Sequence, residues 1–327
     1  MLFLASGVMS EARLHPWLQR YAAATLGVAL VTVVAGTLVT SMKAGMAFRD
    51  WPTSDGYLMV TYPWFRDFAS DWDRFLEHGH RLAGMAIGLF AIGLVAVTHR
   101  YEARRSVRWT SVGVLCGVIC QGLLGGFRVR LDDFGLAQLH GAFAAIVCSA
   151  IAMVMTMLGA RWVQAASESP TADVEHLRPF AVISIVALAF QYFLGGLIRH
   201  HGTGLHEHLG MGFIVLCLLF ANAWLAMTSG VRWIRQAGTL LVLVVTIQVL
   251  LGLGSWVMRY GHGSYVAVVD SIEQVSIRTA HAVVGILTFM VSVVYAARVF
   301  RVYSVARPTP TDALGRPHSN QWAGGAV

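Results

Sequence analysis

Residues 77–98 read EHGHRLAGMAIGLFAIGLVAVT, and this stretch decides the fold class. It opens with a glutamate and two histidines and then continues without a charged residue from Leu82 to Thr98. An apolar run of about this length, roughly 20 residues, is what a membrane-spanning helix needs. Seven further stretches share the property, and we predict an all-α integral membrane protein with eight spans at about residues 21–41, 80–98, 109–127, 138–160, 179–198, 208–228, 237–257 and 279–299.

The composition of the 327 residues supports this class. Hydrophobic residues make up 56% of the chain and charged residues only 13%, about half the share of a soluble domain, which excludes an ordinary cytosolic protein. The net charge of +7 does not indicate nucleic-acid binding, because the Lys and Arg residues fall in small groups between apolar runs. The cysteines predict neither a disulfide framework nor a zinc site, since all of them lie inside apolar segments: Cys116, Cys120, Cys148 and Cys217.

The distribution of positive charge predicts the orientation. Of the 24 Lys and Arg residues, 14 lie on the side that holds both termini, including four between Arg100 and Arg108. By the positive-inside rule we expect both termini in the cytoplasm of a cell-membrane protein and the long loop 42–79 outside. The first nine residues are too short for a cleaved signal peptide, and the polar tail 308–327 is expected to be disordered.

An internal repeat divides the chain into two halves. His80 and His208 are 128 residues apart, and His140 and His281 are 141 apart. A Gln-x-x-x-Gly pattern recurs at Gln121–Gly125, Gln191–Gly195 and Gln248–Gly252. We therefore predict two tandem four-helix bundles of the same orientation.

The expected domains follow from that repeat. They are a cytoplasmic N-terminal segment (1–20), a first bundle (21–160) with its outer loop, a cytoplasmic linker (161–178), a second bundle (179–300) and a cytoplasmic tail (301–327).

The four histidines of the repeat are the main candidates for a functional site. His80, His140, His208 and His281 are each expected in the first turn of an even-numbered span. Ionisable residues inside membrane spans are functional candidates by default, although headgroup-wetted interfacial histidines are the alternative. Two histidines per bundle suit a haem held between facing helices better than a zinc ion, which wants three or four protein ligands.

Other residues fit the same hypothesis. Gly84, Gly212 and Gly285 each lie four residues after a histidine and would admit a flat macrocycle, or simply allow close helix packing. The haem propionates would need cations near the outer surface, and the candidates are Arg81, Arg128 and Arg199, with Arg259 and Arg278 near the last outer loop. Lipid-phosphate contact is the alternative for Arg259 and the preferred interpretation of Arg130.

One carboxylate distinguishes the halves. Glu77 precedes His80 by three residues, which puts both on one face if the helix reaches back that far, whereas Glu207 is adjacent to His208 and off that face. Glu77 is therefore the candidate catalytic carboxylate, with a favourable helix-dipole charge as the alternative. For Gln121, Gln191 and Gln248 we favour interhelical hydrogen bonding.

These residues resemble the haem A synthase family, whose members are eight-helix membrane proteins built from two four-helix halves. The resemblance covers about residues 21–300. Its carriers are Gly36-Thr-Leu-Val-Thr40, Ala44-Gly45, Asp50-Trp-Pro-Thr53, Glu77-His-Gly-His80-Arg81, Gln121-Gly-Leu-Leu-Gly-Gly126, His140, Gly195-Gly-Leu-Ile-Arg-His200, His208 and Thr279-Ala-His281.

The resemblance implies oxidation of the C8 methyl of haem O to a formyl group, giving haem A for haem–copper terminal oxidases. It implies a resident haem b between His208 and His281, substrate haem between His80 and His140, and Glu77 as the catalytic carboxylate. As partners it implies haem O, haem A, a membrane or soluble electron donor and a contact with haem O synthase. It is compatible with an oligomer.

The chain departs from this pattern in places, and two rival functions are open at this point. The first outer loop lacks the cysteine pair of several relatives, and Lys43, Phe48, His206 and Glu207 are unexpected. The principal rival is a two-haem cytochrome that only relays electrons between quinol and a partner, and Glu77 argues against it. A transporter is the weaker rival, because the polar residues gather at the outer surface.

Overall fold

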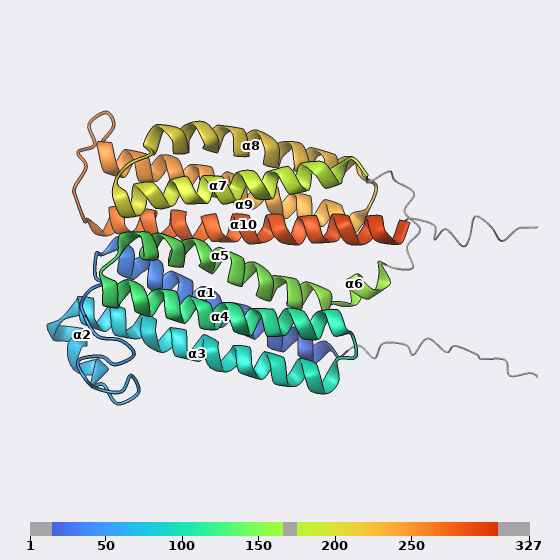
Figure 1. Ribbon diagram of the computed structural model, residues 1–327. Helices are drawn as coiled ribbons and strands as arrows, with labels where there is room; N and C mark the ends of the chain where they lie inside the picture. Colours follow the sequence, from blue (N-terminus) through green and yellow to red (C-terminus); the bar gives the residue numbers. More distant parts are fainter. Residues whose placement is uncertain (1–14, 166–174, 307–327) are drawn as a thin grey trace, which may run out of the picture.

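The computed structural model describes residues 15–165 and 175–306 as an all-helical chain (Figure 1). Within these ranges no strand forms beyond two isolated bridges. Three elements are short: η1 (Trp64–Arg66), α2 (Asp67–Ser70) and α6 (Ala160–Gln164). Eight helices are long and apolar enough to cross a membrane, as predicted, namely α1 (Pro16–Ser41), α3 (Trp72–Tyr101), α4 (Arg105–Leu131), α5 (Phe134–Met157), α7 (Leu177–His201), α8 (Leu205–Thr228), α9 (Arg232–Tyr260) and α10 (Ile272–Ala306).

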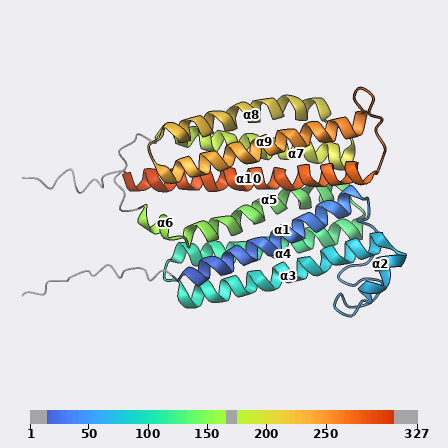
Figure 2. The ribbon, with the colours of Figure 1, turned by 180° about the vertical axis from the view of Figure 1, so that it is seen from behind.

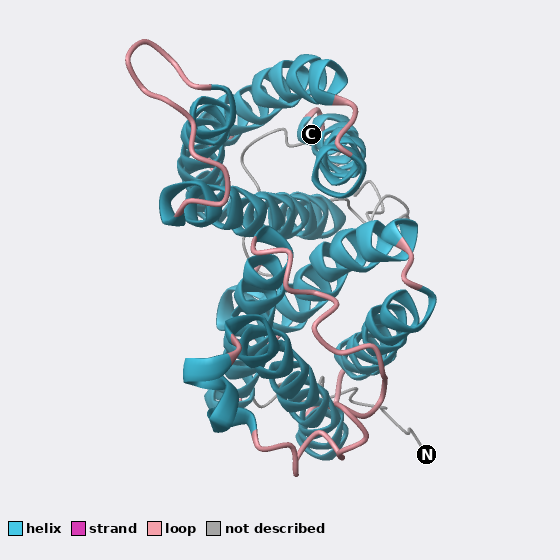
Figure 3. Ribbon diagram, turned by 90° about the vertical axis from the view of Figure 1, so that its left-hand side faces the viewer, coloured by secondary structure: helices cyan, strands magenta, loops and turns pink. Residues whose placement is uncertain are grey.

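The eight helices form two groups of four. Helices α1, α3, α4 and α5 lie on one side and α7 to α10 on the other (Figures 1 and 3). Seen from behind, α1 lies against α3 and α5 (Figure 2). The two groups meet mainly where α10 packs against α5 and α1, and where α5 packs against α7. This arrangement is consistent with two tandem bundles, while the domain boundaries at 21–160 and 179–300 stay a prediction.

The helices begin earlier than the apolar runs. Asp71 caps α3 by accepting a hydrogen bond from the Arg74 N–H (3.1 Å), and Asp133 caps α5 by accepting one from the Leu136 N–H (2.6 Å). These caps let each helix start in the polar sequence before the span, which hydropathy alone does not reveal.

The expected first-turn placement of the histidines is therefore correct only for His208. His140 lies in the second turn of α5, and His80 and His281 lie in the third turns of α3 and α10. The early start of α3 also means that Glu77 is helical, which was the condition for placing it on the face of His80.

The two ends of the molecule differ in content. The loop 42–71 with α2 and the loop 261–271 lie at one end, and α6 with both described chain ends lies at the other (Figure 1). Part of the predicted linker is thus helical. The expectations for residues 1–14, 166–174 and 307–327, including the disordered tail, fall outside the described residues.

The membrane orientation can be tested with fusions. A reporter placed after Arg105 should lie in the cytoplasm and one after Arg66 outside, because 14 of the 24 Lys and Arg residues lie on the side of the termini. Each position is fused in turn to a reporter that is active only in the cytoplasm and to one that is active only outside it, and the active reporter gives the location. The opposite pattern would contradict the orientation and move all four histidines to the inner surface.

Candidate functional site

The four predicted histidines form two pairs of nearly identical geometry. The rings of His80 on α3 and His140 on α5 have centroids 6.3 Å apart and planes at 86°. The rings of His208 on α8 and His281 on α10 have centroids 6.4 Å apart and planes at 84°. Each pair lies within one group of four helices, so the repeat in the sequence is a repeat of the site.

The spacing within each pair suits a metal held between two imidazoles. A metal–nitrogen bond of about 2 Å on each side, with about 1 Å from each nitrogen to its ring centre, separates the centroids by about 6 Å. Both observed separations match this value. Two opposed ligands leave the plane between them open, which is the donor set of a bis-histidine haem.

Each histidine lies against a glycine of the preceding spanning helix. A Cβ atom at Gly36 would lie 2.6 Å from His80 Cε1, and one at Gly125 would lie 3.0 Å from His140 Cε1. In the other half the corresponding distances are 3.2 Å from Gly195 to His208 and 3.1 Å from Gly252 to His281. Four helix pairs therefore repeat one contact, in which a side chain larger than glycine would displace the imidazole.

These glycines were only partly anticipated. The Gln-x-x-x-Gly pattern contains three of these four glycines, but the pattern alone does not predict that they contact the histidines. The glycines singled out for the macrocycle lie elsewhere: Gly212 and Gly285 face the amides of Gln191 and Gln248, and a Cβ at Gly84 would meet nothing within 4 Å. The signal that could have paired the Gln-x-x-x-Gly glycines with the histidines is their order along the chain, because each of these glycines lies in the predicted span directly before the span of its histidine.

Hydrogen bonds fix the orientation of the first histidine pair. His80 Nδ1 lies 3.1 Å from the Thr32 carbonyl, and His140 Nδ1 lies 3.1 Å from the Gln121 carbonyl. An N–H donated from Nδ1 leaves the lone pair on Nε2, the usual arrangement of ligating histidines, and at His140 this nitrogen lies 3.4 Å from the side-chain amide of Gln121. In the second pair Nδ1 of His208 and of His281 is buried without a hydrogen-bond partner.

Two glutamines tie neighbouring helices together, as favoured from the sequence. The side-chain amide of Gln121 donates to the His140 carbonyl (2.8 Å), and that of Gln191 donates to the His208 carbonyl (3.0 Å). Each bond joins the glycine-bearing helix to the histidine-bearing helix at the depth of the site.

Glu77 is buried, with 4% of its surface exposed, beside the first pair only. Its carboxylate accepts a hydrogen bond from the Phe48 N–H (3.2 Å) and pairs with the Arg81 guanidinium (2.8 Å). Arg128 on α4 is also close enough to interact with this carboxylate electrostatically. Glu207, which directly precedes His208 of the second pair, is exposed. The two halves thus differ by one buried carboxylate.

The three arginines expected to bind propionates all contact α1 or the outer loop. Arg81 donates to the carbonyls of Asp50 (2.9 Å) and Thr53 (2.7 Å) as well as to Glu77. Arg128 donates to the Gly45 carbonyl (2.8 Å). Arg199 donates to the Thr37 carbonyl (2.6 Å) and to Ser41 Oγ (3.1 Å) of α1. Their role toward propionates stays a prediction.

The outer loop has its own anchor at Asp50. The N–H groups of Asp55 and Gly56 donate to its carboxylate, both at 2.9 Å. Partial burial by itself would raise the pKa of Asp50, but these hydrogen bonds and the charge of Arg81 hold it below its usual value of 3.8. The indole of Trp51 then packs directly on Gly126 of α4. The loop is therefore fixed over the outer end of the first histidine pair.

The fold and the site define the class of the protein as a multi-pass membrane protein with two histidine pairs of closely similar geometry. The model of the cytochrome oxidase assembly protein family COX15-CtaA matches residues 73–207. A heme A synthase of an Exiguobacterium species is 24% identical over 265 residues, covering 74% of this chain and 83% of that protein.

Two further relatives match over a shorter range. The heme A synthase of Rhodopseudomonas palustris strain BisA53 is 30% identical over 134 residues, which covers 38% of this chain and 36% of the relative. That of Allorhizobium ampelinum is 30% identical over 137 residues, again 38% of this chain and 36% of the relative. These alignments span about a third of either protein. Together the matches support the resemblance to the haem A synthase family drawn from the motifs.

The glycine contacts can be tested through bound haem. Gly252→Val should push the His281 ring away, because even a single Cβ there would lie 3.1 Å from its Cε1 atom. We expect the purified variant to lose most of its haem absorbance per protein while keeping its helical circular dichroism. Gly113→Val is the matched control, since a Cβ at that position meets nothing within 4 Å. Full haem content in Gly252→Val would contradict the contact.

Proposed function

We propose that this protein is a haem A synthase, which oxidises the C8 methyl of haem O to a formyl group and so produces haem A for haem–copper terminal oxidases. The observation that carries the proposal is the buried, ion-paired carboxylate of Glu77 beside one of two otherwise equivalent histidine pairs. An electron relay needs two such pairs but has no use for a carboxylate at one of them. The names of the relatives support the same reaction.

In the proposed enzyme the halves have different roles. His80 and His140 hold the iron of the substrate haem O, and Glu77, three residues before His80 on α3, is the carboxylate on that side. His208 and His281 hold a resident haem b, which when bound supplies one-electron transfer. The protein contributes the two imidazoles at each place and the glycines that let them approach the neighbouring helix.

Glu77 acts on the charge that develops during the oxidation. Removing electrons from a methyl group on a conjugated ring builds positive charge at that carbon, and a fixed carboxylate lowers the energy of this charge. Arg81 and the Phe48 N–H hold the Glu77 carboxylate in one orientation, so little reorganisation is needed when the charge appears. The hydrogen bonds to the Asp50 carboxylate hold the loop whose backbone carbonyls position Arg81 beside Glu77.

The proposal includes the surroundings of the enzyme. We place it in the cell membrane with both termini in the cytoplasm, with Arg81, Arg128 and Arg199 near the propionates. Its small-molecule partners are haem O and haem A. The oxidation removes four electrons from the methyl carbon, and an external oxidant, for which dioxygen is the candidate, must accept them together with the electrons of a donor from the membrane or from solution. Haem O synthase is the source of the substrate.

The resident haem can be tested by removing either ligand. The purified protein should show the reduced spectrum of a low-spin b-type haem, and His208→Ala or His281→Ala should abolish it, because the two imidazoles together would hold the iron. Extraction and mass spectrometry identify the haem. An unchanged spectrum in both variants would disprove the assignment.

The role of Glu77 can be tested by its uncharged isostere. Glu77→Gln should keep the b-type spectrum and bound substrate but lower conversion of haem O by about 10²-fold or more, the usual cost of removing one electrostatic partner of the transition state. Conversion is measured by chromatography of extracted haems from cells supplied with haem O. Glu207→Gln is the matched control, since that carboxylate is exposed beside the second pair.

Two outcomes would contradict the proposal. The first is a wild-type protein that makes neither hydroxylated haem nor haem A, which would favour the electron relay. The second is wild-type conversion by Glu77→Gln, which would remove Glu77 from the chemistry.

A further inference from the structure

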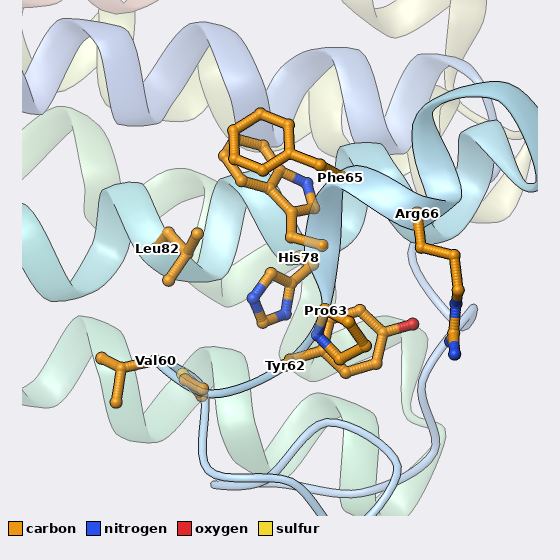
Figure 4. A pocket seen from close by; sticks show the side chains of 9 residues that line it. Val60, Tyr62, Pro63, Phe65, Arg66, His78 and Leu82 are labelled. Atoms are coloured by element: carbon orange, nitrogen blue, oxygen red, sulfur yellow. The ribbon is translucent and has the colours of Figure 1, made fainter.

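A separate cavity of about 380 Å³ lies beside His78, between the outer end of α3 and the loop that precedes η1 (Figure 4). His78 is two residues from His80 in sequence, and so on nearly the opposite face of the helix. Aromatic and aliphatic side chains form most of its wall, with His78 and Arg66 as the polar members: Val60, Tyr62, Trp64, Phe65, Leu82, His78 and Arg66. Its size is in the range of small-molecule sites.

The hydrogen bonds around His78 determine which ring nitrogen carries the proton. Nδ1 of His78 lies 3.1 Å from Ser54 Oγ, and the Arg81 guanidinium lies 3.4 Å from the same oxygen. Arg81 can only donate to this oxygen, and His78 Nδ1 is the one acceptor that the described hydrogen bonds offer the Ser54 hydroxyl, so the hydroxyl is satisfied when it donates to Nδ1. The neutral imidazole therefore carries its hydrogen on Nε2.

That Nε2–H has no acceptor among the described residues. The nitrogen is fully buried and makes no hydrogen bond, and the backbone carbonyl of Met59 approaches the ring without reaching hydrogen-bond geometry. Buried donors in proteins are almost always satisfied. A ligand that brings an oxygen atom into the cavity would satisfy this one.

The walls indicate that the ligand is lipid-soluble and flat. Val60 and Phe65 at the rim are 69% and 78% exposed, and Leu82 belongs to a spanning helix, so the rim is apolar at the depth of the outer membrane surface. The Tyr62 ring lies 4.6 Å from the His78 ring and the Trp64 ring 6.2 Å from it. Aromatic walls this close favour a planar ring over flexible acyl chains.

We propose that this cavity binds the head group of a lipid-soluble quinone, with a quinone oxygen accepting the Nε2–H of His78 and the ring against Tyr62 and Trp64. A phospholipid ester also offers a carbonyl, but it has no ring to pack against these walls. The binding itself is independent of the proposed function. Only the further role of such a ligand as the electron donor rests on that function.

Direct binding to the purified full-length protein tests the proposal. Isothermal titration calorimetry with decylubiquinone in detergent should show saturable binding. His78→Phe keeps a ring of similar size but removes the donor, and it should raise Kd by about 10-fold, the effect of one hydrogen bond. His99→Phe is the matched control at the other end of α3, where the histidine is exposed, and its Kd should be unchanged.

Two further variants keep the test independent of the folding of His78→Phe. Ser54→Ala removes the hydroxyl that fixes the proton on Nε2 and should weaken binding by a smaller factor. Leu82→Trp should fill the cavity from its membrane side and abolish binding. Normal quinone binding in both variants would overturn the proposal.

Competition separates the sources of the ligand oxygen. Phosphatidylcholine and farnesol, an isoprenoid alcohol without a quinone ring, should displace decylubiquinone only weakly. If phosphatidylcholine or farnesol displaces decylubiquinone as effectively as excess quinone does, the cavity binds a lipid ester or a prenyl chain and the proposal is overturned. The absence of saturable quinone binding would also overturn it. Because no step measures haem conversion, a failure of the proposed enzyme activity would leave these results unaffected.

Discussion

The close approach of a glycine to each histidine is the constraint on which the rest of the structure depends. At Gly36, Gly125, Gly195 and Gly252 the neighbouring imidazole occupies the space of a side chain. This contact fixes the distance between the two helices of each pair, and the backbone carbonyl four residues earlier in α1 and α4 then meets Nδ1 of the histidine. Close packing through small residues is a major source of stability between helices in a membrane, where burial from water contributes little. The same contact thus holds the bundle together and aims its ligands.

Arg81 accounts for most of the difference between the halves. A cation expected at the propionates instead bonds the carbonyls of Asp50 and Thr53 and the carboxylate of Glu77. A buried carboxylate without a partner would cost free energy, and the ion pair with Arg81 offsets that cost. The loop, the carboxylate and the arginine are therefore one interdependent unit, and the second half has no equivalent because Glu207 is exposed to its surroundings.

Much of this could be predicted from the sequence, and the limits have physical causes. The spans follow from hydropathy, and the histidine pairs and the glutamine hydrogen bonds follow from the repeat of histidines and of Gln-x-x-x-Gly in the sequence. The helix starts could not be read from hydropathy, because Asp71 and Asp133 begin helices in polar sequence. The partners of Arg81 could not be read either, since they are backbone carbonyls of a loop that has no periodicity. The sequence predicts no role for His78, because the residues that surround its side chain come from that same loop.

The fourfold glycine–histidine contact also bears on how such a protein changes over generations. A helical hairpin used four times is a unit that duplication can copy, and each copy inherits a working place for an imidazole. Once three copies hold their geometry, the surroundings of the remaining one are free to diverge without loss of the scaffold. The loop 42–71 beside His80 differs from its counterpart at 261–271, since it is longer and carries the additional short helices. New chemistry could in this way be acquired by one half while the other kept the ancestral task.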